Sequence, residues 1–227
     1  MPKWLKIALA GLTALVTLIV AAFFVAYFAS SGNYGVPKTV DHDDSLPYIE
    51  IKADRFHGES LGNPENPVVV VLHGGPGQDY RMLYPLRALK DKYFVIFYDQ
   101  RGSGLSPRVP DGQLTLEQFI KDLDNIIDKF SNGRRVTLVG HSWGAMLASA
   151  YIGKHHDKLD GAVLAEPGFL TSEMGQRFME RVNWMRPEKL YFNDIVAIGK
   201  LFFKSLHVKE TNGHEQMDWL FSRIASL

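Results

Sequence analysis

Residues 140–144 read Gly-His-Ser-Trp-Gly, and this segment lies between an apolar run and a helical stretch. The run before it, residues 136–139, is Val-Thr-Leu-Val, which favours a buried strand. The stretch after it, residues 145–153, contains no proline and favours a helix. A chain that passes from strand to helix so quickly must turn sharply, and glycines remove the Cβ atoms that would clash in such a turn. The segment therefore predicts a strand–turn–helix unit with Ser142 at the turn.

Strands and helices alternate on both sides of this unit. Apolar runs rich in β-branched or aromatic residues at 68–72, 93–98 and 161–165 predict further buried strands, and residues 48–55 alternate like an edge strand. Such alternation predicts the α/β class, with a parallel central sheet flanked by helices. In such sheets the active site lies at the carboxyl ends of the strands.

One helix between these strands has a clear start signal. Thr115 and Gln118 have the spacing of a capping box. The apolar residues that follow recur at helical spacing: Leu116, Phe119, Leu123, Ile126, Ile127 and Phe130. A helix that begins after Thr115 is therefore predicted.

The amino-terminal segment has the composition of a membrane span. Residues 7–29 carry no charge, and twelve of these 23 positions are Leu, Ile, Val or Phe. A helix of this length measures about 35 Å, which is enough to cross a hydrocarbon core of about 30 Å. Lys3 and Lys6 precede the span, whereas acidic residues follow it at Asp41, Asp43 and Asp44. The positive-inside rule then places the amino terminus in the cytoplasm and the rest outside the cell membrane, as a single-pass protein.

Two alternatives to an uncleaved anchor exist. The small residues at 29–31 are acceptable to a signal peptidase, although the apolar run is longer than the 7–15 residues usual for a signal peptide. A buried core helix is the other alternative, and the length of the run argues against it.

The chain divides into four parts by composition. Residues 1–30 form a cytoplasmic stub and a transmembrane anchor, and the polar residues 31–47 form a linker. Residues 48–168 contain the predicted α/β core, and residues 169–227 carry only helical spacing, as in a partial helical cap. Within this last part, helices are predicted at 171–184, 194–206 and 215–227.

Charge and cysteine content exclude several functions. The 25 basic and 25 acidic residues cancel and form no block of one sign, so no nucleic-acid partner is expected. The absence of cysteine excludes disulfides, thiolate catalysis and Cys-ligated metals. No metal or organic cofactor is expected, and the sequence does not indicate an oligomeric state.

The Gly-His-Ser-Trp-Gly segment matches the nucleophile elbow, in which a sharp turn presents a serine at the end of a strand. The amino terminus of the following helix favours developing negative charge beside Ser142. We therefore expect Ser142 to be the catalytic nucleophile.

Residues 73–77, His-Gly-Gly-Pro-Gly, follow another predicted strand and suit an oxyanion loop. Acyl transfer requires two N–H groups that point at the developing oxyanion. The backbone N–H of Trp143 is one candidate, and that of Gly75 or Gly74 is the other; Gly74 also lies where substrate should bind. His73 is expected to fix the loop rather than to act as a general base.

Together with residues 99–104, Asp-Gln-Arg-Gly-Ser-Gly, the loop and the elbow resemble the proline iminopeptidase group of α/β-hydrolases. The resemblance covers about residues 48–168, with a weaker match for the helical part that follows. It implies an α/β-hydrolase fold and a serine peptidase that removes an amino-terminal residue, often proline. It also implies that Arg101 holds its loop.

The same resemblance implies that acidic residues read the free amine of the substrate. Glu166, Glu173 and Glu180 are candidates by position, and Glu166 is favoured for substrate binding because it follows a strand. In some relatives of the wider fold this strand end carries the triad acid instead. His141 stands where the family often has a small residue, and its side chain is expected to diverge from Ser142.

The remaining members of a catalytic triad are not identifiable in this chain. The family order is serine, acid, histidine, and no strand is predicted after residue 168. The later histidines are His155, His156, His207 and His214, and none has the position of a base. We therefore expect that Leu227 is not the natural end of the fold. The chain alone should be nearly inactive, because loss of the base costs a serine enzyme about 10⁶ in rate.

The sequence thus predicts a membrane-anchored serine hydrolase of proline iminopeptidase type that acts on small peptides. An esterase or lipase-like hydrolase acting on small esters is the alternative enzyme, and a non-catalytic binding remnant is the third possibility. Epoxide hydrolase and haloalkane dehalogenase chemistry needs an aspartate nucleophile, which Ser142 disfavours.

Overall fold

A computed structural model describes residues 2–184, 192–208, 219, 220 and 223 of the chain. The chain separates into two compact units. Residues 37–186 form the larger unit, which holds the sheet, and residues 1–36 with 187–227 form the smaller one.

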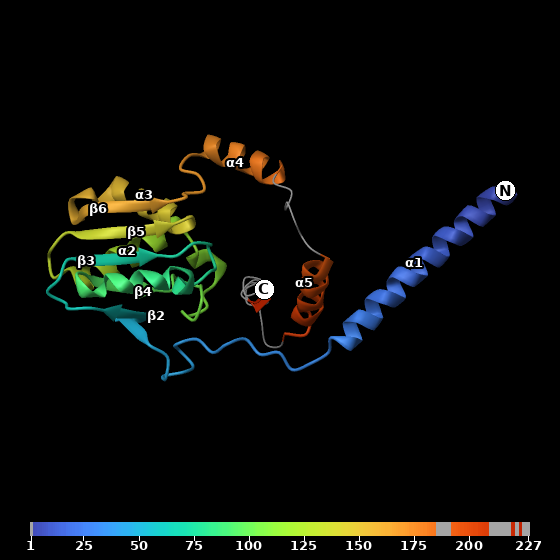
Figure 1. Cartoon of the computed structure of the whole chain (residues 1–227), viewed down its shortest axis with the longest axis horizontal. Helices are drawn as coiled ribbons and strands as arrows, with labels where there is room; N and C mark the ends of the chain where they lie inside the picture. Colours follow the sequence, from blue (N-terminus) through green and yellow to red (C-terminus); the bar gives the residue numbers. More distant parts are fainter. Residues whose placement is uncertain (1, 185–191, 209–218, 221–222, 224–227) are drawn as a thin grey trace. The chain divides into compact units, whose positions relative to one another are not determined.

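The larger unit is built on a mixed sheet in the order β1-β2-β4-β3-β5-β6 (Figure 1). The strands are β1 Tyr48–Ile51, β2 Asp54–Leu61, β3 Val68–Leu72, β4 Phe94–Tyr98, β5 Val136–His141 and β6 Leu159–Ala165. The last four are mutually parallel, whereas β1 and β2 pair in the antiparallel sense. The predicted α/β fold is therefore confirmed, but the sheet is not parallel throughout.

The predicted edge strand at 48–55 is wrong in one respect, because the chain turns back within it. β1 and β2 form a tight hairpin in which Ile51 pairs with Asp54. Lys52 takes a positive φ of 56° at the turn. Neither turn residue is glycine, asparagine or aspartate, so the usual hairpin signal is missing from the sequence.

Helices cover both faces of the sheet. The helical segments of this unit are η1 Tyr80–Asp91, η2 Asp111–Gln113, α2 Leu116–Ser131, α3 Trp143–His155, η3 His156–Lys158 and α4 Ser172–Trp184. α2 and α3 share one apolar cluster with Val68, Val70 and Leu72 of β3. η1 lies on the opposite face, in a second cluster with Val69 and Val71. β3 is thus buried on both faces, as its continuous apolar run predicts.

The start of α2 agrees with its predicted cap, although only half of the capping box forms. Thr115 Oγ1 accepts a hydrogen bond from the Gln118 backbone N–H at 3.2 Å. The Gln118 side chain does not reach back to Thr115 but donates to Asp122 Oδ1 at 2.8 Å. Gln118 therefore supports a buried carboxylate, whose role is described below.

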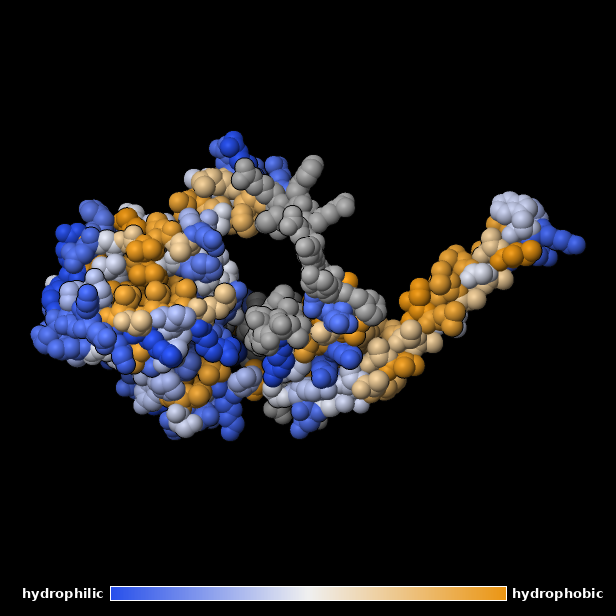
Figure 2. Space-filling model, in the orientation of Figure 1, coloured by the Kyte–Doolittle hydropathy of each residue, from blue (hydrophilic) through white to orange (hydrophobic). Residues whose placement is uncertain are grey.

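β6 forms one edge of the described sheet and is poorly covered. Val163 is 55% exposed and Leu164 is 38% exposed. Figure 2 shows apolar side chains gathered on the face over β5 and β6. Among the described residues, η1 contacts β3 and β4 on that face, so its cover ends before β6.

The smaller unit contains α1 Lys3–Ala29 and α5 Phe192–Ser205. α1 is long and apolar enough to cross a membrane, and none of its residues is buried. Figure 2 shows apolar side chains along most of its length, with hydrophilic ones at its amino-terminal tip. α5 agrees with the helix predicted at 194–206, and α4 of the larger unit with the one at 171–184. Most of the helix predicted at 215–227, together with His214, lies outside the described residues.

Candidate active site

The turn between β5 and α3 has the strained backbone that the sequence motif predicts. Ser142 has φ 52° and ψ −116°, a conformation that L-residues rarely adopt. A Cβ on Gly140 would overlap the Gly144 carbonyl, and a Cβ on Gly144 would overlap the Leu72 carbonyl. The two glycines therefore allow α3 to start directly against β3, with Ser142 at the carboxyl end of β5.

The glycine loop lies beside this serine. A Cβ placed on Gly74 would stand 3.4 Å from the Ser142 Cβ. Gly75 has φ 123°, which only glycine adopts without strain. Trp143 is the first residue of α3, where backbone N–H groups have no partner within the helix. The structure thus brings Gly74 next to Ser142, and it places the Trp143 N–H at the helix terminus that follows Ser142.

His73 fixes the glycine loop from the buried side. Its Nδ1–H donates to the Gly74 carbonyl at 2.8 Å, and its Nε2 accepts from the Gln100 N–H at 2.9 Å. These two bonds require the neutral ring, and burial lowers the pKa of His73 accordingly. The structural role predicted for His73 is confirmed.

Gln100 is a residue that sequence analysis did not single out. Its side-chain amide donates to the His73 carbonyl at 2.9 Å, and its Oε1 accepts from Trp143 Nε1 at 2.9 Å. Gln100 is 1% exposed, so both bonds are shielded from water. It therefore ties the glycine loop to the first residue of α3. Only its place beside Arg101 in the 99–104 segment hinted at such a role.

Arg101 is buried and holds its loop by ion pairs, as the family resemblance implies. Nε and one terminal nitrogen donate to the two carboxylate oxygens of Asp122, at 2.7 and 2.8 Å. A further bond joins it to Asp54 Oδ2 at 2.8 Å. These carboxylates raise the pKa of Arg101. These ion pairs connect the loop after β4 with α2, through Asp122, and with β2, through Asp54.

Asp99 organises the same loop through both of its carboxylate oxygens. Oδ2 lies 2.7 Å from His57 Nδ1 and accepts from the Leu105 N–H at 2.8 Å. Oδ1 accepts from the Tyr80 N–H at 3.0 Å, at the start of η1. A Cβ on Gly104 would overlap this carboxylate, which explains the glycine. Asp99 is fully buried, and its carboxylate links His57, Leu105 and Tyr80.

His141 and Glu166 form a polar pair beside the glycine loop. His141 Nε2 lies 3.6 Å from Glu166 Oε2. A Cβ on Gly74 would stand 3.2 Å from His141 Nδ1, so the imidazole remains close to the loop that faces Ser142. The pairing with Glu166 keeps the ring at the strand ends, and the expected divergence of His141 from Ser142 stays a prediction. The Glu166 side chain is 88% exposed.

The other predicted residues lie elsewhere. Glu173 pairs with Arg177 on an exposed face of α4, and Glu180 is also exposed. His155 stacks on Tyr151 at the end of α3, and His207 belongs to the smaller unit. Within the part of the chain that the structure describes, no hydrogen bond joins a histidine to Ser142 Oγ.

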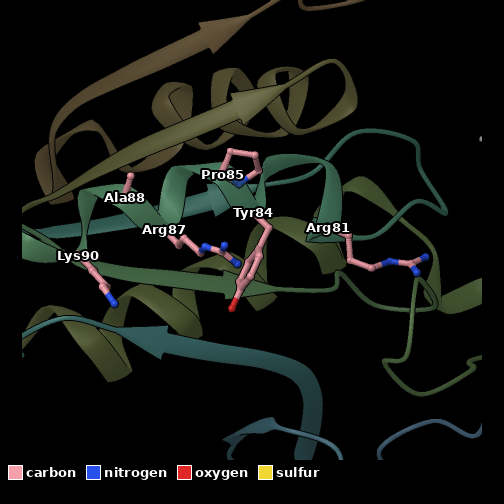
Figure 3. A pocket seen from close by; sticks show the side chains of 6 residues that line it. All are labelled: Arg81, Tyr84, Pro85, Arg87, Ala88 and Lys90. Carbon is pink, nitrogen blue, oxygen red and sulfur yellow. The ribbon is translucent and has the colours of Figure 1, made fainter. Parts of the chain in front are cut away.

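A separate groove runs along η1 (Figure 3). Its lining is Arg81, Tyr84, Pro85, Arg87, Ala88 and Lys90. The Arg87 guanidinium stacks on the Tyr84 ring at 4.6 Å. None of the residues placed around Ser142 lines this groove, so it is not part of the candidate active site.

A strained serine between a parallel strand and a helix, beside a glycine loop on the neighbouring strand, defines the α/β-hydrolase class. The family model described as "alpha/beta hydrolase fold" matches residues 67–198, and the chain belongs to this family.

Within the family the chain is proline iminopeptidase-like. A proline iminopeptidase from Heyndrickxia coagulans is 45% identical over 102 residues, which are 44% of this chain and 34% of that protein. Human epoxide hydrolase 4 is 36% identical over 104 residues, covering 44% of this chain and 28% of that protein. The chain thus spans about a third of the length of these relatives.

A solved structure agrees on the fold. The proline iminopeptidase-related protein from Thermus thermophilus has a TM-score of 0.52 at 20% identity. The match covers 80% of this chain and 73% of that structure.

Proposed function

We propose that this protein is a serine hydrolase in which Ser142 attacks a carbonyl carbon and forms an acyl-enzyme. The observation that carries the proposal is the strained turn at Ser142, φ 52° and ψ −116°, with Gly74 beside it. Strain of this kind persists only where the surroundings impose it, and it is concentrated at functional sites. The two overlaps that Gly140 and Gly144 avoid are the surroundings that impose it here.

The proposed chemistry begins when Ser142 Oγ adds to the substrate carbonyl. The N–H groups of Trp143 and Gly75 then stabilise the oxyanion, and the leaving group departs with a proton. Water hydrolyses the acyl-enzyme in the second half of the reaction. Removal of one oxyanion donor costs about 3–4 kcal/mol of transition-state stabilisation in a well-studied protease. The bonds from His73 and Gln100 give the loop the rigidity that such stabilisation requires.

Proton transfer from Ser142 needs a general base, which the described residues do not supply through a hydrogen bond. A serine without its base retains only weak activity.

We further propose an aminopeptidase that removes amino-terminal residues, proline among them. The relative from Heyndrickxia coagulans supports this substrate class because it is a proline iminopeptidase. Glu166 would pair with the free ammonium group of the substrate, since its carboxylate is exposed at the end of β6, the strand next to β5. Gly74 would let the substrate approach the loop closely.

A substrate panel tests this proposal. Proline p-nitroanilide, its N-acetylated form and p-nitrophenyl acetate would be compared as substrates of the protein isolated from its native membrane. We expect turnover of the free amine, at least about tenfold loss on acetylation, and loss of all turnover in Ser142→Ala; tenfold corresponds to about 1.4 kcal/mol. Ser149→Ala is the matched control, because its hydroxyl only bonds to the Ala145 carbonyl within α3.

The panel also separates the alternatives. Equal rates on free and acetylated anilides, or a preference for the ester, would favour the esterase hypothesis. No turnover and no acyl-enzyme on any substrate would favour a non-catalytic binding protein.

We propose that α1 anchors the protein in the cell membrane, with the hydrolase unit outside. Its length and composition and the lysines before it support the anchor and its direction. A cleaved signal peptide remains the alternative.

A further inference from the structure

α5 of the smaller unit has an exposed apolar face. Ile195 is 54% exposed and Phe202 is 47% exposed, and their separation of seven positions corresponds to about two helical turns. These two side chains therefore lie on the same side of the helix. Lys204 follows Ile195 by nine residues, or about two and a half turns, and so lies on the opposite side. α5 is amphipathic, with its apolar face uncovered among the described residues.

This helix meets α1 near the carboxyl end of α1. The Phe203 ring lies 5.4 Å from the Phe23 ring, between centroids. The His207 ring lies 4.2 Å from the Tyr27 ring, between centroids, at a tilt of 37°, and its Nε2–H donates to the Tyr27 carbonyl at 2.8 Å. The same carbonyl also accepts from the Ser30 hydroxyl at 2.8 Å and from the Ser30 N–H at 3.2 Å, so His207 adds a further donor to the last turn of α1. The contact fixes α5 to the last turns of α1.

Those last turns are where a spanning helix leaves the hydrocarbon. A span needs about 20 residues, which counted from Ile7 end at Ala26. Four aromatic residues gather there: Phe23, Phe24, Tyr27 and Phe28. Tyr and Trp side chains are enriched at this depth of a bilayer, and Tyr27 fits that pattern. α5 therefore starts from a contact at the membrane–water boundary.

The polar side of α5 is directed to the chain that follows the span. Lys204 Nζ lies 6.0 Å from the centre of the Tyr34 ring. Tyr34 also pairs with Val208 in an isolated parallel bridge, which holds the segments after α1 and after α5 together. The lysine side of α5 thus lies beside the polar linker, and the apolar side faces away from Lys204.

We propose that α5 lies in the headgroup–acyl boundary of the bilayer that α1 crosses, with Ile195 and Phe202 in contact with lipid. The partner is the phospholipid surface. The exposed apolar face of α5 continues the apolar surface of α1, so both helices contact the same bilayer. Amphipathic helices with lysines on the polar side bind in this plane. The inference rests on the proposed membrane anchor and adds a second contact with the same membrane.

Depth measurements on the full chain test this inference. The chain contains no cysteine, so single-cysteine variants accept one fluorescent label each. Phe202→Cys and Ile195→Cys report on the apolar face, Lys200→Cys is the matched control on the polar side, and Leu15→Cys reports on the middle of α1. The labelled proteins are reconstituted in vesicles of phosphatidylcholine and phosphatidylglycerol and quenched by nitroxide lipids or by aqueous iodide.

We expect labels at positions 202 and 195 to lie about 5–10 Å into the headgroup–acyl boundary, with blue-shifted emission. The label at position 200 should be quenched by iodide, and the label at position 15 only by deep nitroxides. A lipid-embedded label at 15 together with iodide-accessible labels at 202 and 195 would overturn the inference and leave the anchor intact. An iodide-accessible label at 15 would overturn the anchor and the inference with it.

Shielding of the labels at 202 and 195 from both quenchers would mean that protein covers the face, which also overturns the inference. The two positions guard against a local effect, since Ile195→Cys leaves Phe202 in place. Disagreement between them would count against an interfacial helix, because both side chains lie on one face.

Discussion

At the scale of single residues, the site depends on buried polar groups that complete each other's hydrogen bonds. His73 and Gln100 exchange bonds with each other, with Gly74 and with Trp143. A buried polar group without a partner costs about 1–3 kcal/mol, so each of these residues constrains the others. The network holds the glycine loop against the helix that starts after Ser142.

The positions of Ser142, Gly74 and Trp143 follow from the sequence because a backbone turn places them. The motif fixes the turn, and the turn fixes the neighbours of the serine. Gln100 and the His141–Glu166 pair were not predicted, since their partners come from segments far apart in the chain. The sequence carries no local signal for such bonds.

The buried His73 makes stability depend on pH. Its pKa is lowered from 6.5 by burial, so the unfolded chain takes up the proton first as the pH falls. The free energy of unfolding should therefore decrease below about pH 6.5, with a slope from this group of up to about 1.4 kcal/mol per pH unit. Urea unfolding at pH 7.5 and 5.5 measures this decrease in the free energy of unfolding.

His73→Gln is the control for this prediction, because the amide can donate and accept but does not titrate. The free energy of unfolding of the variant should depend less on pH than that of the wild type over this interval. Equal dependence in both proteins would show that His73 does not contribute.

At the scale of elements, apolar runs predicted β3 and β4 because a strand buried on both faces must be apolar throughout. Apolar runs also predicted β5 and β6, but the burial expected for β6 is wrong, because most of that strand is exposed at the edge of the described sheet. The hairpin of β1 and β2 escaped prediction, since its turn at Lys52 lacks the usual residues. The antiparallel sense of β1 and β2 was missed for the same reason. Strand pairing depends on turns, and this turn leaves no mark in the composition.

The close packing of α3 against β3 gives a second prediction. Gly144→Ala should destabilise the larger unit by about 1–3 kcal/mol or more, because the new Cβ would overlap the Leu72 carbonyl. Gly153→Ala in the same helix has open space around it and should stabilise the protein by about 0.4–1 kcal/mol. Urea midpoints of the two variants measure the difference.

Similar midpoints for the two variants would contradict the close contact between α3 and β3. The comparison controls for helix propensity, since both variants replace a helical glycine with alanine.

At the scale of the whole molecule, an α/β-hydrolase unit is joined in sequence to a long apolar helix. The sequence predicted both, because periodicity and length are properties that a single chain displays. It did not predict that α5 would contact α1. That contact joins residues that lie far apart in sequence, such as Tyr27 and His207.

The anchor leads to a topology prediction. Protease added to intact cells or spheroplasts should digest the part of the chain after residue 30, because the lysines before α1 stay in the cytoplasm. Immunoblotting of the membrane fraction follows the loss. Protection that ends only when detergent opens the membrane would reverse the proposed orientation.

The central claim is that Ser142 is the nucleophile, and active-site labelling tests it most directly. The protein isolated from its native membrane is treated with a fluorophosphonate, digested and mapped by mass spectrometry. We expect a single adduct on the peptide that contains Ser142, its absence in Ser142→Ala, and its retention in Ser149→Ala. An adduct that persists in Ser142→Ala, or wild-type protein that stays unlabelled while a known serine hydrolase in the same sample reacts, would contradict the account.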